Sequence, residues 1–290
     1  MYDEWRNVTP KPAYEQEYKW LAQEIDRYNA DDGNLNQWHI NIISGEEVEP
    51  DGIDCPICKN KGQIMTMMFS EEGKPYKALG RCKCAKKRDA IGRIRRSGLG
   101  DSIERCTFDT FEVNEPWQER LKEKVIEYTE KGAKEGKWLY IGGQPGSGKS
   151  HLCTAAVGKL LENYETLYAV WPRMAQELKA LAMDDEAYDR AIHRYLVADL
   201  LYIDDFFKPV NRDSKSTATG ADVRVAFDII NDRYIKHNKI TIISSEWFIR
   251  ELDEIDEATS SRIYERCDGN VLNIKRDDKR NFRYKDIINI

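Results

Sequence analysis

Short apolar runs alternate with helical stripes of apolar residues along the second part of the chain. Four runs have the length of a buried strand, and they cover residues 137–141, 167–171, 200–203 and 240–243. A stripe at helical spacing lies between the last two runs and consists of Val223, Phe227, Ile230 and Tyr234. Because strands that alternate with helices form parallel sheets covered on both faces, the pattern predicts an α/β fold from about residue 101 onward.

Two further stripes predict helices. One lies between Pro116, which favours a helix start, and Gly132, which favours a helix end; its members are Trp117, Leu121, Val125 and Tyr128. The other lies near the N-terminus and consists of Tyr14, Tyr18, Leu21, Ile25 and Tyr28. This N-terminal helix either packs on its own domain or docks on a partner protein.

Composition narrows the class of protein. The 290 residues carry a formal net charge of −6, so contact with nucleic acid would have to come from local basic clusters. No apolar run approaches the roughly 20 residues that span a membrane, and the N-terminus lacks the charge and apolar core of a signal peptide. We therefore expect a cytoplasmic protein whose 7 cysteines are reduced.

Four cysteines form two close pairs, Cys55 with Cys58 and Cys82 with Cys84, on either side of a segment with hairpin turn signals. Two such pairs are typical of a closed, structural Zn²⁺ site with four thiolates. The second pair has a one-residue spacer, which departs from the commonest pattern, and four unconnected buried cysteines are the alternative. A segment this small would depend on the metal for its stability.

Basic residues follow the cysteine pairs directly; they are Lys83, Lys86, Lys87, Arg88, Arg93, Arg95 and Arg96. Such a run is either a solvated face or a contact for a phosphate backbone or an acidic partner. The chain thus suggests three parts: a helical arm over 1–50, a zinc-binding module with a basic tail over 51–100, and an α/β domain over 101–290.

The run at 137–141 leads into a complete phosphate loop at 143–150, Gly-Gln-Pro-Gly-Ser-Gly-Lys-Ser, and a helical stripe follows. Glycines let backbone N–H groups surround a phosphate, while the helix N-terminus and Lys149 add positive charge. Ser150 is placed to contact Mg²⁺. The loop predicts that the chain binds a nucleoside triphosphate and Mg²⁺, and the resemblance given below implies ATP; the predicted contacts are Gly143, Gly146, Ser147, Gly148, Lys149, Ser150 and His151.

Two acids end the run at 200–203. Asp204 is placed to support the Mg²⁺, and Asp205 to activate or orient an attacking water. The run at 240–243 ends in Ser244-Ser245-Glu246, where many hydrolases of this layout sense the terminal phosphate. Arg262, on a predicted helix, is the residue type that stabilises transferred phosphoryl charge, often from a neighbouring subunit. Surface acids and a solvated arginine are the plainer interpretations.

Taken in order, these motifs resemble the DnaC/DnaI-type replicative helicase loaders, AAA+ ATPases close to the initiator DnaA and the transposition helper IstB. The resemblance covers roughly residues 101–275 and rests on residues 107–111, the phosphate loop, residues 200–208, the Ser-Ser strand end and Ser261-Arg262. The cysteine module resembles the front end of DnaI-like loaders. The resemblance implies an AAA+ fold, a P-loop parallel sheet with helices on both faces.

Roles for single residues also follow from the resemblance. It implies that Asp204 supports the metal ion and that Asp205 supports the attacking water. It also implies that Arg262 reaches into the site of a neighbouring subunit and that Ser245 lies at the nucleotide. The chain departs from the pattern at Glu246, where loaders often carry asparagine. Candidates for a second sensor arginine are Arg280 and Arg283, and candidates for contact with single-stranded DNA are Arg190, His193 and Arg194.

The implied partners are a hexameric replicative helicase of the DnaB type and single-stranded DNA, with self-assembly on either and no membrane contact. The alternatives are an IstB-like transposition helper, a P-loop small-molecule kinase, and a module that keeps ATP as a structural ligand. The cysteine module and aromatic N-terminal helix favour a loader over a helper. The paired acids and the late Ser-Arg favour hydrolysis over transfer to a small molecule.

Overall fold

The computed structural model divides into two compact units, Met1–Gly92 and Arg93–Ile290. It describes residues 4–40, 45, 47–48, 50–97, 99–161, 163–208, 218–277 and 280–282. None of the helices in this described part is long and apolar enough to cross a membrane. The finer division into an arm, a zinc module and an ATPase domain stays a prediction.

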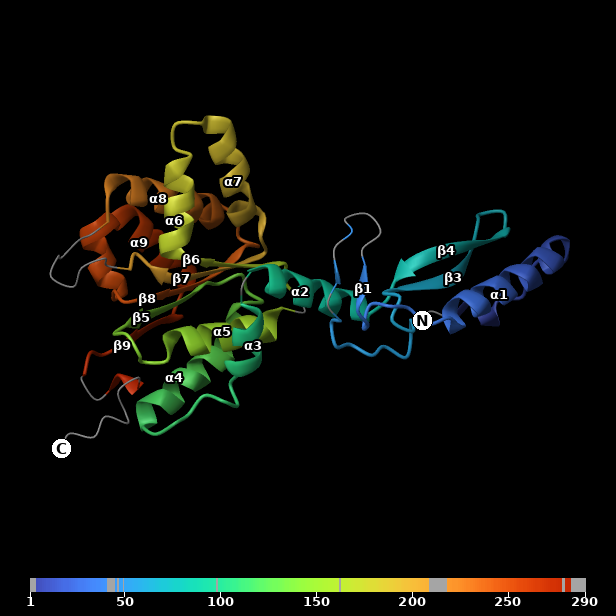
Figure 1. Ribbon diagram of the computed structural model, residues 1–290, viewed down its shortest axis with the longest axis horizontal. Coiled ribbons are helices and arrows are strands. Elements are labelled where there is room, and N and C mark those ends of the chain that lie inside the picture. The colour runs from blue at the N-terminus through green and yellow to red at the C-terminus, as the bar shows by residue number, and fades with distance from the viewer. Residues whose placement is uncertain are drawn as a thin grey trace. The chain divides into compact units, whose positions relative to one another are not determined.

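The first unit is a helix packed on a two-stranded antiparallel hairpin (Figure 1). In chain order its elements are η1 (Glu4–Asn7), η2 (Pro12–Tyr14), α1 (Glu15–Ala30), β1 (His39–Ile40), β2 (Glu47–Val48), β3 (Gln63–Phe69), β4 (Pro75–Arg81) and the start of α2 (Cys84–Ser97).

The apolar stripe of α1 faces the hairpin. Leu21 and Ile25 form a buried core with Trp5 and Met67. The side-chain amide of Asn29 donates to the carbonyl oxygen of Met65 at 2.8 Å and accepts from the N–H of the same residue at 3.0 Å. The N-terminal helix therefore packs within its own unit, and its docking on a partner stays a prediction.

The second unit is a five-stranded parallel sheet in the order β6-β7-β8-β5-β9. Its strands are β5 (Leu139–Gly143), β6 (Thr166–Val170), β7 (Leu200–Phe206), β8 (Ile240–Ser245) and β9 (Val271–Ile274). Figure 1 shows α3, α4 and α5 on one side of the sheet and α6, α7, α8 and α9 on the other.

The helices of this unit are α3 (Gly100–Arg105), α4 (Pro116–Glu127), α5 (Lys149–Leu160), α6 (Trp171–Ala180), α7 (Asp185–Val197), α8 (Gly220–Ile235) and α9 (Asp253–Cys267). The π-helical turn η3 (Tyr128–Gly132) continues α4, and the 3₁₀ turn η4 (Ile249–Leu252) precedes α9. The predicted α/β fold with helices on both faces is confirmed.

The four predicted apolar runs correspond to β5 to β8, although Lys137 and Trp138 of the first run precede β5. Trp171 begins α6, although the run predicted it as the end of a strand. Strand β9 was not predicted, because it is an edge strand in which only Ile274 of four residues is buried. A strand with so little apolar burial carries a weak periodic signal.

The buried face of α8 also differs from the prediction. Ile230 is buried as expected, but Phe227 and Tyr234 are only half-buried. The centre of the face is formed by Ala226 and Ile229, which are fully buried. Phe227 and Tyr234 instead contact α9, where the Arg262 guanidinium lies over their rings at 5.1 and 5.7 Å from the centroids.

Candidate nucleotide site and cysteine cluster

The phosphate loop connects the end of β5 to the start of α5, as its sequence requires. Gly148 has a φ of 88°, and a Cβ at this position would lie 2.7 Å from the Phe111 ring. Both the left-handed backbone and the close ring exclude a larger residue. The backbone N–H groups at the start of α5 are therefore presented toward the loop, where an anion binds favourably.

Lys149 is buried at the base of this loop. Its Nζ donates to the carbonyl oxygens of Gly143 at 2.7 Å and Gln144 at 2.8 Å. Burial lowers the pKa of Lys149, and the nearby carboxylates of Glu246 and Asp205 oppose that shift. The ammonium group is thus held in the loop that its predicted role requires.

Asp204 lies at the centre of a hydroxyl cluster. Its Oδ1 accepts from the hydroxyl of Ser150 at 2.9 Å and from that of Ser244, and its Oδ2 accepts from Tyr168 at 3.3 Å. Ser150 and Asp204 come from α5 and β7, yet their oxygens are in hydrogen-bond contact. This pair of hard oxygen donors beside a phosphate loop fits the requirements of Mg²⁺.

The backbone of Asp205, the residue after Asp204, has an unusual conformation. Its φ is 56°, a left-handed conformation that is uncommon for residues other than glycine. Its backbone N–H donates to the Ser244 hydroxyl at 3.2 Å, and its carboxylate forms a 2.7 Å ion pair with Lys208. The two residues share Ser244, but their carboxylates have separate partners: Asp204 accepts from hydroxyl groups, and Asp205 pairs with Lys208.

A cavity of about 290 Å³ joins the loop to these strand ends. Its lining consists of Pro145, Gly146, Gly148, Lys149, Ser150, His151, Asp205, Lys208, Glu246 and Phe282. Ser245, predicted at the nucleotide, is fully buried, and its hydroxyl donates to the carbonyl oxygen of Phe206 at 2.7 Å. At this strand end it is Glu246 that lines the cavity, and a nucleotide role for Ser245 stays a prediction.

A second cavity of about 230 Å³ adjoins the first, because the two share Gly146, Gly148, His151 and Phe282. Its wall is completed by Thr110, Phe111, Glu112, Asn114, Gln118 and Ser147. His151 is fixed between the cavities: its Nε2 lies 2.8 Å from the Thr107 carbonyl oxygen, and its ring meets Phe111 edge-on at 5.3 Å. Aromatic rings next to a phosphate site suit a nucleobase.

Arg262, predicted to reach into a neighbouring subunit's site as an arginine finger, does not line either cavity of its own chain. Its Nη1 donates to the Ala258 carbonyl oxygen at 2.7 Å, and its guanidinium stacks on the two rings of α8. Arg266, on the same helix, is buried and donates to the carbonyl oxygens of Gly136 and Tyr234, both at 2.7 Å. Arg266 is therefore a structural arginine.

Three of the remaining basic candidates, Arg190, Arg194 and Arg280, have partners within the chain. Arg190 pairs with Glu186 at 3.3 Å and Arg194 with Glu177, whereas His193 is exposed. Arg280 stacks on the Trp117 ring at 4.9 Å. The other candidate for a second sensor, Arg283, lies outside the described residues.

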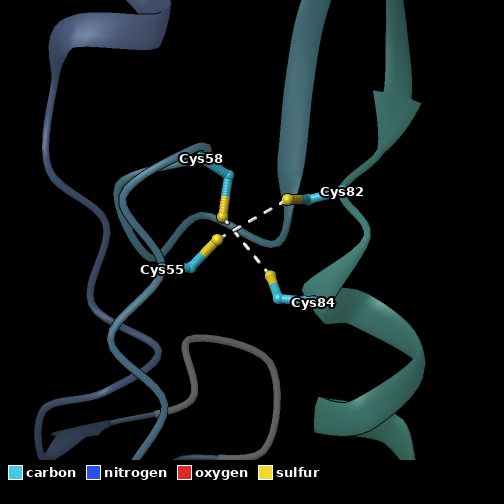
Figure 2. A group of neighbouring side chains, drawn as sticks. All are labelled: Cys55, Cys58, Cys82 and Cys84. Carbon is cyan, nitrogen blue, oxygen red and sulfur yellow. Dashed lines mark hydrogen bonds between the residues drawn. The ribbon is translucent and has the colours of Figure 1, made fainter. Parts of the chain in front are cut away.

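The four paired cysteines come together as predicted (Figure 2). Their Sγ atoms all lie within 4.8 Å of one another, with Cys55 to Cys82 at 3.7 Å and Cys58 to Cys84 at 3.5 Å. Thiolates around a tetrahedral Zn²⁺ would be roughly 3.8 Å apart, given Zn–S bonds of about 2.3 Å. The cluster therefore has the donors and the spacing of a closed metal site.

A second layer of hydrogen bonds orients the sulfurs. The Gly62 N–H donates to Cys58 Sγ at 3.3 Å, and Arg88 Nε donates to Cys84 Sγ at 3.4 Å. Arg88 is buried and also pairs with Asp51. It was predicted as part of a basic surface run, and this is corrected: Arg88 belongs to the cluster, while Lys83, Lys86 and Lys87 are exposed. The side chains of Arg93, Arg95 and Arg96 lie outside the described residues.

The pKa values of Cys84 and Cys55 are shifted in opposite directions. Burial raises the pKa of Cys84 to about 12. Burial also acts to raise the pKa of Cys55, but backbone N–H groups of Cys58 and Ile57 outweigh it, and that pKa lies at about 7. Binding a metal at all four sulfurs would therefore release protons.

Comparison with known proteins places the chain. It is 30% identical over 242 residues to the phage-like element PBSX protein XkdC of Bacillus subtilis (strain 168), a match that covers 81% of this chain and 88% of XkdC. The chain belongs to the XkdC family. Protein YqaM of the same strain, described as uncharacterized, is 29% identical over 279 residues, with coverage of 81% of this chain and 86% of YqaM.

No family model matches this XkdC-family chain. Among solved structures, the DnaC helicase loader is 23% identical, matches 60% of this chain and 99% of its own, and has a TM-score of 0.49. The parallel sheet that carries the phosphate loop and the four-cysteine cluster, both predicted from the motifs, are present in this XkdC-family chain.

Sequence reasoning missed three contributors to the nucleotide site of this XkdC-family chain. Phe111 and Lys208 stand inside segments that carried the resemblance, but neither received a role there. Phe282 lies in the C-terminal segment, where its N–H donates to the Gly146 carbonyl oxygen at 3.0 Å. No local pattern marks it, since the contact joins residues 136 positions apart (282 minus 146).

Proposed function

We propose that this protein is an ATP-dependent loader of a hexameric replicative helicase, which uses ATP binding and hydrolysis as its switch. One observation carries the ATPase part: the Ser150 hydroxyl donates to Asp204 beside the phosphate loop, and the adjacent Asp205 carboxylate, paired with Lys208, lines the same cavity. The loader part is supported by the ordered motifs of the resemblance and by a separate N-terminal unit that contains a cysteine cluster.

The site suggests how the work is divided. The phosphates lie against the N–H groups of the loop and Lys149, and the base enters the adjoining cavity beside Phe111. Ser150 and Asp204 would hold Mg²⁺, which supplies positive charge for the phosphates when bound. Asp205 orients the attacking water and accepts its proton, while Arg262 of one subunit completes the site of the next.

The rate of ATP hydrolysis by the full chain in the presence of Mg²⁺, measured with and without single-stranded DNA, tests the ATPase part. We expect hydrolysis that DNA changes and that Lys149→Ala abolishes. A small-molecule kinase would instead need an acceptor molecule for turnover, and a chain that keeps ATP as a structural ligand would show none under either condition.

The cysteine cluster would hold Zn²⁺ in a structural role, since four thiolates leave no open position for chemistry. We expect about one zinc per chain in protein purified without chelators. Cys55→Ser is expected to lose the metal and unfold the first unit, because a small module depends on its metal for folding, while nucleotide binding by the second unit stays intact.

Metal analysis and thermal unfolding of the full chain check this expectation. Cys106→Ser is the matched control, because Cys106 lies outside the cluster and its loss should leave the zinc content unchanged. Wild-type protein without zinc, or Cys55→Ser with a full complement, would contradict the zinc assignment.

A further inference from the structure

The strand-end side of the phosphate cavity carries an excess of acids for a site that receives a polyphosphate. Asp205 and Glu246 line the cavity there, and Asp204 lies behind Ser150. A carboxylate so close to the end of a phosphate chain would repel it, unless a cation intervenes.

Lys208 supplies a cation at this point. Its Nζ lies 2.7 Å from Asp205 Oδ2 and 3.7 Å from Glu246 Oε1, and its side chain lines the cavity together with Lys149. Lys149 belongs to the loop side and Lys208 to the strand-end side. The two ammonium groups therefore stand at different places along the path that a phosphate chain would follow.

The backbone that presents Lys208 is a strained turn held by packing. Asp205 and Phe207 both have left-handed φ values, 56° and 51°, and the Lys208 N–H donates to the Asp205 carbonyl oxygen at 3.0 Å. The Phe207 carbonyl oxygen accepts from the Trp247 indole at 2.7 Å, and the Phe207 ring packs on Trp171 at 5.0 Å. Strain that the surroundings hold in place is characteristic of functional sites.

We propose that Lys208 is the residue that contacts the terminal phosphate of ATP and distinguishes ATP from ADP. The inference rests on the proposed function. If Asp205 activates water at the terminal phosphate, an ammonium 2.7 Å from its carboxylate is within reach of that phosphate. The flexible four-carbon side chain of Lys208 allows its ammonium group to move from the carboxylate to the phosphate. Movement of Lys208 to the phosphate leaves the Asp205 carboxylate to accept from water, so that triphosphate binding and activation of the base are coupled.

Calorimetric titration of the full chain with Mg²⁺ and either ADP or a non-hydrolysable ATP analogue tests this. Lys208→Met keeps most of the stem and removes the charge. We expect it to weaken analogue binding by about tenfold or more, the loss of a charged hydrogen bond, with ADP binding changed less than about twofold. Lys208→Arg should restore most of the discrimination, and Lys131→Met, an exposed lysine outside the cavity, should change neither ligand.

A second experiment changes Glu246 together with Lys208. Adding Glu246→Gln to Lys208→Met should recover analogue affinity, because the repulsion that Lys208 offset is then absent. Equal losses for both ligands, no loss, or tighter analogue binding by Lys208→Met would overturn the inference while the proposed function stands. If wild-type protein binds neither nucleotide, both fail together.

Discussion

Asp205→Asn is expected to lower ATP turnover by about 10²- to 10⁴-fold, the range of a lost general base, while ATP binding stays close to that of the wild type. Under the proposed function, binding is retained because the loop and Lys149 would hold the phosphates, while Ser150 and Asp204 would hold the metal ion. Asparagine is chosen because it tolerates the left-handed φ of 56° at this position better than alanine does.

Turnover and nucleotide affinity of Asp205→Asn are measured on the same preparation, because a transition-state role lowers turnover without raising the dissociation constant. Asp189→Asn on α7, an exposed acid that does not line the nucleotide cavities, is the matched control. Full turnover by Asp205→Asn would remove this carboxylate from the mechanism. A matching loss of ATP binding would make it a ligand for the nucleotide instead.

Arg262→Ala is expected to bind ATP as the wild type does and to lose hydrolysis on the order of 10³-fold in the assembled state. Its side chain does not line either cavity of its own chain, so a direct effect on that chain's pocket is not expected. Its stack on Phe227 and Tyr234 adds some stability, and thermal unfolding of the variant measures that contribution separately.

Mixing gives the sharper result. Arg262→Ala supplies an intact pocket and Lys149→Ala an intact finger, so mixed assemblies should regain activity that neither variant has alone. Arg120→Ala on α4, an exposed arginine, serves as the control and should keep full activity. Normal hydrolysis by Arg262→Ala with helicase and single-stranded DNA present would contradict the finger assignment.

The sequence is sufficient to predict the elements in which one strong local pattern decides the structure. The phosphate loop, the apolar runs of β7 and β8, and the cysteine pairs each carry their signal within about ten residues, as turn chemistry and period do generally. The helix between Pro116 and Gly132 was predicted for the same reason. In the structure it consists of α4 and η3, and Val125 and Tyr128 are buried.

Features that depend on distant partners were not predictable in this way. In the sequence Arg88 is one of seven basic residues in a run, but its contacts with Asp51 and Cys84 make it part of the cysteine cluster. Ser245 reads as a sensor, but the strand end turns its hydroxyl toward Phe206 and leaves Glu246 in the cavity. In each case contacts with residues of other segments decide what the side chain does.

Lys208 shows the same limit at the nucleotide site. A lysine three residues after an acid is commonplace, and its meaning comes from the left-handed turn at Asp205 and from Glu246, which β8 supplies. Lys208 and Glu246 both stand in motifs that the sequence analysis describes, but no local pattern relates one to the other. Only their distance across the cavity makes Lys208 a candidate for contact with a phosphate.

The most direct test of the loader proposal measures transfer of the replicative helicase encoded in the same genome onto closed circular single-stranded DNA. A closed circle has no end, so a hexameric ring gains access only if it is opened. The account predicts that the wild-type chain with ATP places the helicase on the circle, and that Lys149→Ala does not. Helicase that reaches the circle equally well without this protein, or with Lys149→Ala, would contradict it.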